Sequence, residues 1–219
     1  MPNRRGFTLC GRELSGLRHI CCFYDSREQQ HDVFAPYLRE GLACGEQVVC
    51  IFPADRHQEL RDRLRREGVD VDAASADGQL GVLSDDETYV TGGMFAKDRM
   101  VAMLREVLDK ARADGRGFVR TLGEMDWALR NLPGTDDLAE YESSVNELTA
   151  AYDCTLACAY DINKFSGRVL MDALCTHSHL VLNGEVHENA YSMSPRDFRK
   201  VLAMRPGGPG VVSREAARS

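Results

Sequence analysis

Two kinds of hydrophobic pattern alternate along this chain. Short apolar runs of strand length lie at residues 19–24, 48–52, 80–83, 118–122 and 154–160, and the segments between them carry apolar residues at helical spacing. Strands separated by helices pair in parallel, because each connection must cross a face of the sheet. The pattern therefore predicts one α/β domain, with a mostly parallel sheet between two layers of helices.

Local signals predict where several of these elements begin and end. Pro36 lacks a backbone N–H, so we expect the first helix to begin close to Asp32 and to end at Gly45. Asn183-Gly184 is a strong tight-turn signal and predicts a C-terminal β-hairpin that pairs residues 180–182 with residues 186–188. A last short helix is expected at residues 195–204.

The domain boundaries follow from the same pattern. We expect an N-terminal tail over residues 1–15, a single domain over residues 16–204, and a disordered tail over residues 205–219. A chain of 219 residues with 43% hydrophobic content is long enough to bury one substantial core.

Charge and composition narrow the class of protein. The formal net charge of −7 argues against direct binding of nucleic acid, whose phosphates are held by clustered Lys and Arg. No apolar stretch is long enough to span a bilayer, and residues 1–5 lack the apolar segment of an export signal. We therefore expect a cytoplasmic protein without membrane contact, in which the eight cysteines stay reduced.

The first strand is not followed by a phosphate-binding loop. Residues 25–30, which come directly after it, contain no glycine, whereas a P-loop needs glycines, a Lys and a Ser or Thr to hold phosphates and magnesium. Bound ATP with Mg²⁺ is therefore not expected. The scaffold is predicted to serve a purpose other than nucleotide hydrolysis.

Acidic and aromatic residues gather at the predicted carboxyl ends of the strands, where open parallel sheets bind ligands. They are Tyr24, Asp25, Glu124, Asp126, Trp127, Tyr160 and Asp161. Aromatic faces offer apolar contact and carboxylates orient a polar or cationic group, so the set predicts a pocket for a small, largely apolar molecule. The alternative is that the acids cap helices and Trp127 is a core residue. The loop over residues 85–95, with Gly92-Gly93, is a candidate lid.

Two other classes of function stay open. If His177 and His179 lie in a strand, they point to one face and could hold a metal with Cys175 or His187, as in a metal- or redox-responsive protein. An enzyme could instead use Glu124 and Asp126 as paired acids, if burial separates their pKa values.

The order of several short segments resembles the MEDS domain, a sensory domain named for methanogen and methylotroph proteins and a dichloromethane-responsive repressor. The resemblance rests on segments spread over residues 16–198: His19-Ile20-Cys21, Pro36-Tyr37-Leu38, Gly78-Gln79-Leu80, Gly92-Gly93-Met94-Phe95, Met125-Asp126-Trp127-Ala128-Leu129, Tyr160-Asp161 and Thr176-His177. Ser178 stands where proline is more usual. The resemblance implies a RecA-like fold without the ATPase loop, used to detect hydrocarbon derivatives.

Together these observations predict a stand-alone cytoplasmic sensor. Members of the family are often fused to histidine kinases or DNA-binding domains, so here the signal is expected to pass by contact with such a regulatory protein. The expected ligand-binding residues are the strand-end set together with His19. By analogy with RecA-like proteins, which often assemble, a homodimer is also considered.

Overall fold

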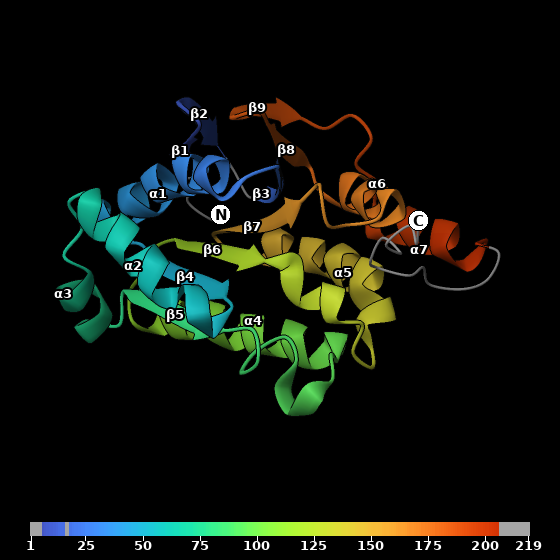
Figure 1. Cartoon of the computed structure of the whole chain (residues 1–219), viewed down its shortest axis with the longest axis horizontal. Coiled ribbons are helices and arrows are strands. Elements are labelled where there is room, and N and C mark those ends of the chain that lie inside the picture. Colours follow the sequence, from blue (N-terminus) through green and yellow to red (C-terminus); the bar gives the residue numbers. More distant parts are fainter. Residues whose placement is uncertain (1–5, 16–17, 206–219) are drawn as a thin grey trace, which may run out of the picture.

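A seven-stranded sheet forms the centre of the molecule, as the computed structural model shows for residues 6–15 and 18–205 (Figure 1). The strands lie in the order β5-β4-β6-β7-β3-β8-β9 and all pair in parallel except the last, which is antiparallel to β8. The prediction of a mostly parallel α/β sheet flanked by helices and ending in a β-hairpin is confirmed.

The elements follow the predicted order, with additional short helices. The strands are β1 (Gly6–Leu9), β2 (Arg12–Ser15), β3 (Arg18–Tyr24), β4 (Gln47–Phe52), β5 (Leu80–Ser84), β6 (Val119–Glu124), β7 (Cys154–Asp161), β8 (His179–Leu182) and β9 (Glu185–Glu188). The helices are α1 (Arg27–Ala43), α2 (His57–Arg66), α3 (Val71–Ala76), α4 (Lys97–Ala113), α5 (Leu138–Ala151), α6 (Gly167–Thr176) and α7 (Pro195–Ala203). The described residues also form the 3₁₀ helices η1 (Ala54–Arg56), η2 (Thr91–Gly93), η3 (Met125–Arg130) and η4 (Thr135–Asp137).

Two hydrophobic clusters hold helices to the two faces of the sheet. One joins the sheet to α1, α2, α3 and the β1–β2 hairpin, and the other joins it to α4, α5 and α6. Neighbouring residues of a central strand point alternately into the two clusters, as Cys21 and Cys22 do. This explains why the central strands read as continuous apolar runs: both of their faces are buried.

The first helix begins earlier than the sequence predicts. The Ser26 hydroxyl accepts a hydrogen bond from the Gln29 N–H and caps a helix that starts at Arg27, so Pro36 lies inside it. Proline in a helix leaves the carbonyl four residues earlier, here that of Asp32, without its usual partner. Both Asp32 and Pro36 are exposed, which leaves this side of the helix facing water. The expected start near Asp32 was wrong because the serine cap was overlooked.

Residues 6–15, assigned above to a tail, form the β1–β2 hairpin. Its turn places Cys10 at φ 50° and Gly11 at φ 72°, as a two-residue hairpin turn requires. Phe7, Leu9 and Leu14 are buried against the domain. The predicted disordered tail, apart from Arg205, lies outside the described residues.

Candidate functional site

The sheet brings the predicted strand-end residues to one edge. Tyr24 ends β3 and pairs in register with Asp161, which ends β7, while Glu124 ends the neighbouring strand β6. Asp126 and Trp127 follow within η3. The strand ends therefore lie at one edge of the sheet, as expected for parallel strands.

Basic side chains pair with the acids at this edge. Arg56, from η1, is bonded to the buried Glu124 and also donates to the Gln30 side chain at 2.9 Å. Burial raises the pKa of Glu124 and the Arg56 guanidinium opposes that rise. Lys164 pairs with Asp126 and with Asp161, at 3.2 Å for the latter. Ion pairs thus neutralise the acids at this edge of the sheet.

The aromatic residues at this edge are packed inside the protein. Trp127 is 1% exposed and contacts two rings, those of Tyr89, stacked at 4.8 Å between centroids, and Phe95, tilted at 4.5 Å. Tyr24 is buried as well. Tyr89 and Phe95 belong to the proposed lid, so that segment is anchored on Trp127 in this conformation.

Several buried polar atoms at this edge still have no hydrogen-bond partner among the described residues. They are the Tyr24 hydroxyl, Gln30 Nε2, Asp126 Oδ1 and Trp127 Nε1. Buried polar groups are normally bonded, so these atoms keep a capacity for a small polar partner. Ligand binding at this edge, including the roles of Asp25 and Asp161, stays a prediction.

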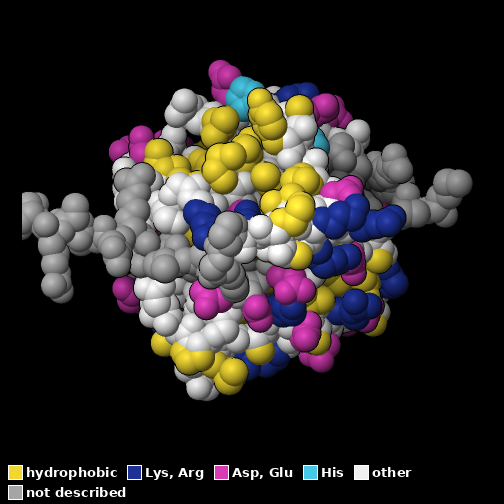
Figure 2. Space-filling view, turned by 90° about the vertical axis from the view of Figure 1, so that its right-hand side faces the viewer, with side chains coloured by type: hydrophobic (Ala, Val, Ile, Leu, Met, Phe, Trp, Pro, Cys, Tyr) yellow, Lys and Arg dark blue, Asp and Glu magenta, His cyan; other side chains and the backbone are white. Residues whose placement is uncertain are grey.

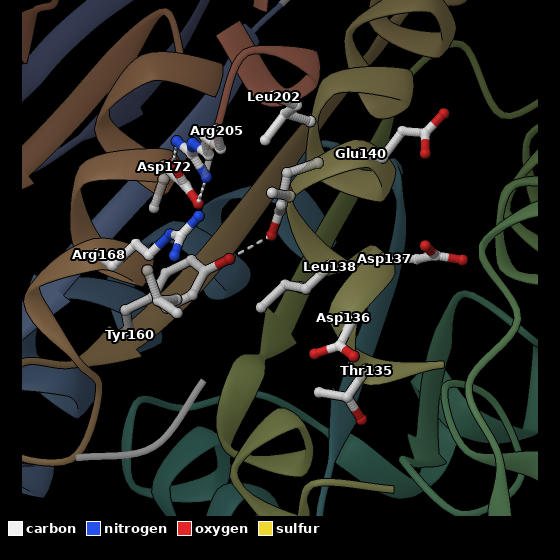
Figure 3. A pocket seen from close by; sticks show the side chains of 14 residues that line it. Thr135, Asp136, Asp137, Leu138, Glu140, Tyr160, Arg168, Asp172, Leu202 and Arg205 are labelled. Carbon is white, nitrogen blue, oxygen red and sulfur yellow. Dashed lines mark hydrogen bonds and ion pairs between the residues drawn. The ribbon is translucent and has the colours of Figure 1, made fainter. Parts of the chain in front are cut away.

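A partly enclosed cavity of about 130 Å³ lies beside the end of β7 (Figure 3). Its walls come from η4, α5, β7, α6 and α7, and the Tyr160 ring and the Leu138 side chain stand on facing sides of it. Val169, Ala173 and Leu202 add further apolar surface. Tyr160 is the residue of the predicted strand-end set that lines this cavity.

Polar contacts fix two parts of the cavity wall. The Asp172 carboxylate forms a two-pronged ion pair with the Arg205 guanidinium, which ties α6 to the chain just after α7. The Tyr160 hydroxyl donates a 2.5 Å hydrogen bond to Glu142 Oε1, seen as a dashed line in Figure 3. Glu142 is therefore held at the inner end of the cavity.

Glu142 also belongs to a fully buried group, whose other members are His19, Cys158 and His177. Glu142 Oε2 is 3.2 Å from His19 Nε2, 3.5 Å from His177 Nε2 and 3.5 Å from Cys158 Sγ. Cys158 Sγ is also 3.5 Å from His19 Nε2. The four ligand atoms, one from each residue, all lie within 4.8 Å of one another.

The charges in this group are strongly coupled. Burial would raise the pKa of Glu142, but His177, His19 and the Tyr160 hydroxyl outweigh it and lower that pKa to about 2. Burial and the neighbouring His19 lower the pKa of His177 to about 3, against the pull of Glu142. The two imidazole rings lie 3.8 Å apart, which disfavours a charge on both, so we take His177 as neutral. The hydrogen bonds from His19 and Tyr160 then favour the ionised form of Glu142.

Of the four predicted metal ligands, the structure gathers only His177 into this group, and His187 lies exposed on β9. His177 follows the end of α6 and turns inward, whereas β8 begins at His179, whose Nδ1 lies 3.0 Å from the Ser178 hydroxyl. Cys175 lies within α6 and is outside the group. Cys175, His177 and His179 do not share one face because the strand begins two residues later than assumed.

His19 was singled out by family resemblance alone, and Glu142 and Cys158 were missed as partners. They sit on α5 and β7, far from His177 in the sequence. The available signal was a charged residue on the buried stripe of a helix, since Glu142 follows the buried Tyr141.

Fold and site together define a class: a RecA-like α/β domain that lacks the phosphate loop and holds a small cavity beside its sheet. The chain belongs to the MEDS family, the methanogen/methylotroph, DcmR sensory domain, whose sequence profile matches residues 18–178. It is accordingly a sensory protein of the regulatory class.

Similar proteins agree with this assignment. The chain is 29% identical over 172 residues to the transcriptional repressor DcmR of Methylorubrum extorquens, a match that covers 77% of this chain and 61% of the repressor. A KaiC-like protein of Pyrococcus horikoshii shares the fold at a TM-score of 0.52 with 13% identity, over 80% of this chain and 71% of that one. Within the part of the chain that the structure describes, no helix is long and apolar enough to cross a membrane.

Proposed function

We propose that this protein senses a small, largely apolar molecule that binds in the cavity beside Tyr160. The observation that carries the proposal is the cavity itself, because Leu138, Val169, Ala173 and Leu202 give it apolar surface. Charged side chains, among them Glu142, Arg168 and Asp172, line the rest of its wall. Its volume of about 130 Å³ is similar to that of a cavity of roughly 150 Å³ that accepts benzene. The ligand class is thus a compound of about benzene size.

The walls of the cavity also suggest how binding is communicated. Helices α6 and α7 line it on one side, and exposed hydrophobic residues lie on or next to them: Met171, Tyr191 and Met204. Figure 2 views this end of the molecule and shows hydrophobic side chains gathered on its upper part. A ligand that shifts α6 against α7 would change this surface, which a regulatory protein partner or a second copy of the chain reads.

The name of the similar repressor supports a role for this protein in the control of gene expression. A transcriptional repressor acts on gene expression, so we infer that the partner of this protein is a transcription regulator or a histidine kinase, met in the cytoplasm. The ligand and the partner of this chain are not fixed by that name, because the match covers only part of the repressor.

A titration with small apolar probes tests the cavity. Benzene, toluene, cyclohexane and dichloromethane are added separately to the full chain, and binding is followed by protein-detected NMR. We expect at least one probe to bind, and Ala173→Leu, which fills the cavity, to weaken that binding by roughly tenfold or more. Ala150→Leu, at an exposed position of α5, is the matched control and should bind as the unchanged chain does.

The strand-end edge is a second candidate site, supported by its unpartnered buried polar atoms. Trp127 is the chain's single tryptophan, so its fluorescence reports on that edge. A probe that changes Trp127 fluorescence and binds Ala173→Leu undiminished would move the site from the cavity to Tyr24, Asp126 and Trp127. If no probe binds at either place, the proposed ligand class is wrong.

A further inference from the structure

The buried group of His19, Glu142, Cys158 and His177 has the composition of a transition-metal site. Its donor atoms are two imidazole nitrogens, one sulfur and one carboxylate oxygen, which are the ligand types that zinc takes in proteins. The four residues come from β3, α5, β7 and the end of α6, so the fold itself converges on one point. All four side chains are at most 5% exposed.

Four of the six separations between the donors are close to those of tetrahedral coordination. The other two, from His177 Nε2 to His19 Nε2 and to Cys158 Sγ, are no longer than 4.8 Å, so His177 would shift slightly to complete the site. Bonds of about 2.0–2.3 Å from a tetrahedral zinc ion to N, O and S place neighbouring donors roughly 3.3–3.6 Å apart. The measured separations between Glu142 Oε2, His19 Nε2 and Cys158 Sγ are 3.2, 3.5 and 3.5 Å. His177 Nε2 is 3.5 Å from the same Glu142 oxygen and has no hydrogen-bond partner among the described residues.

The surroundings orient two of the four donors, His177 and Glu142. The opposite nitrogen of His177, Nδ1, lies 2.7 Å from the Ala173 carbonyl, so an Nδ1–H that donates there leaves the Nε2 lone pair facing the group. The Tyr160 hydroxyl donates to Glu142 Oε1 and leaves Oε2 facing the other donors. Such outer contacts are characteristic of metal ligands, whose orientation they fix.

The net charge also suits a divalent ion. The Cys158 thiol, which donates to Glu142 in the metal-free structure, would release its proton to solvent when the ion binds. The resulting thiolate and the carboxylate together carry two negative charges, and two neutral imidazoles carry none, so the sum with a dication is zero. A neutral assembly avoids the large cost of burying an unbalanced charge. We propose that His19, Glu142, Cys158 and His177 bind one zinc-like divalent transition-metal ion.

The proposed site does not depend on the ligand of the cavity. Glu142 and Tyr160 line both the cavity and the approach to the metal group, so the two sites are neighbours that share a wall. The metal site can be tested without any organic compound. Failure of the cavity titration therefore leaves the metal inference standing, and the reverse also holds.

The test measures metal on the full chain. Protein stripped with chelator and dialysed is titrated with Zn²⁺, and with Co²⁺ as a spectroscopic probe. We expect one ion per chain and a thiolate-to-cobalt charge-transfer band. Cys158→Ser should abolish the band, and His177→Gln should weaken Zn²⁺ binding by roughly 100-fold or more, since even outer contacts are worth about 10–100-fold.

Matched controls separate loss of a ligand from general damage. Cys154→Ser changes a buried cysteine on the same strand, four residues away, and His187→Gln changes an exposed histidine. Both should bind metal as the unchanged chain does. Circular dichroism checks that each variant is folded; if Cys158→Ser does not fold, the unchanged chain and His177→Gln still decide the outcome. Absence of a cobalt band in the unchanged chain, or a band that survives in folded Cys158→Ser, overturns the proposal.

Discussion

Arg120 shows how a charged residue is kept inside this protein. It is 1% exposed, donates to Glu46 at 2.5 Å and to the Tyr37 carbonyl at 2.8 Å, and lies 4.9 Å from the Tyr37 ring centroid. Glu46 is buried too and depends on Arg120 for its charge partner, whereas Arg120 also pairs with Glu40 at 2.7 Å. Buried pairs of this kind stabilise little in total, yet removal of one partner leaves an uncompensated charge.

Replacement of Arg120 should therefore be costly. We expect Arg120→Met to lower the free energy of unfolding by roughly 3–5 kcal/mol, measured by urea titration, because Glu46 is left buried and unpaired. Arg116→Met, which breaks a pair with the exposed Asp77, is the control and should cost about 1 kcal/mol or less. Equal losses in the two variants would show that the buried pair has no special role.

At the strand-end edge, the absence of a side chain at Gly123 leaves room for Tyr89. A Cβ atom added there would lie 2.3 Å from the Tyr89 hydroxyl, on the residue that stacks on Trp127. We expect Gly123→Ala to push Tyr89 aside, shift the Trp127 emission and destabilise the fold by roughly 1–3 kcal/mol, as overpacking does. Gly117→Ala, where an added Cβ meets nothing within 4 Å, should leave the emission unchanged. An unaltered spectrum in Gly123→Ala would mean that Tyr89 is loosely held.

At the level of elements, the β1–β2 hairpin acts as part of the domain. The Phe7 ring lies 6.0 Å from the Tyr37 ring and 6.1 Å from the Phe118 ring, and the Thr8 N–H donates to Glu40 on α1. The hairpin thereby covers one end of the cluster formed by α1 and the sheet.

Truncation of Phe7 tests this role. Phe7→Ala should lower the free energy of unfolding by roughly 3 kcal/mol, since buried aromatic residues cost about 3–5 kcal/mol when removed from a core. Glu13→Ala, on the exposed side of β2, should change it by less than about 0.5 kcal/mol. A hairpin that behaves as a loose tail would give the same small value for both, as a paired urea titration would reveal.

The sequence predicts elements better than it predicts the site. Apolar runs such as residues 48–52 identify buried strands because burial on both faces leaves no polar position. The hairpin was missed although Phe7, Leu9 and Leu14 alternate around Cys10-Gly11, because each of its strands is only four residues long. The buried group of His19, Glu142, Cys158 and His177 was missed because its members become neighbours only when the sheet forms.

The strand-end residues illustrate the same limit. Position along a strand predicts that Tyr24, Glu124 and Asp161 share an edge, and it does so without knowledge of side chains. It gives no information about Arg56, which reaches that edge from a short 3₁₀ helix and pairs with Glu124. Whether such an edge is open or filled depends on side chains from other parts of the chain.

For the whole molecule, a bound metal ion would join the sheet to the helical layer formed by α4, α5 and α6. His19 and Cys158 lie on adjacent central strands, Glu142 on a covering helix and His177 at the end of another. A ligand that binds only the folded state stabilises it by RT ln(1 + [L]/Kd).

Zinc should consequently raise the melting temperature of the stripped chain. At about 100 times Kd the gain is roughly 2.7 kcal/mol, which for a chain of this size corresponds to about 5–10 °C in Tm by calorimetry. His177→Gln should show no such rise, whereas His187→Gln should retain it. A rise of the same size in His177→Gln would place the ion elsewhere.

Glu142 has one carboxylate oxygen on Tyr160 and the other on the two histidines. A molecule in the hollow that draws the phenol away would free that carboxylate to turn, and the grip on any ion behind it would weaken. Thermodynamic reciprocity then demands the converse: the supply of metal in the cell would set how readily the organic compound is detected. Through the single side chain of Glu142, the concentration of free metal ion would then change the concentration of the organic compound that is needed for a response.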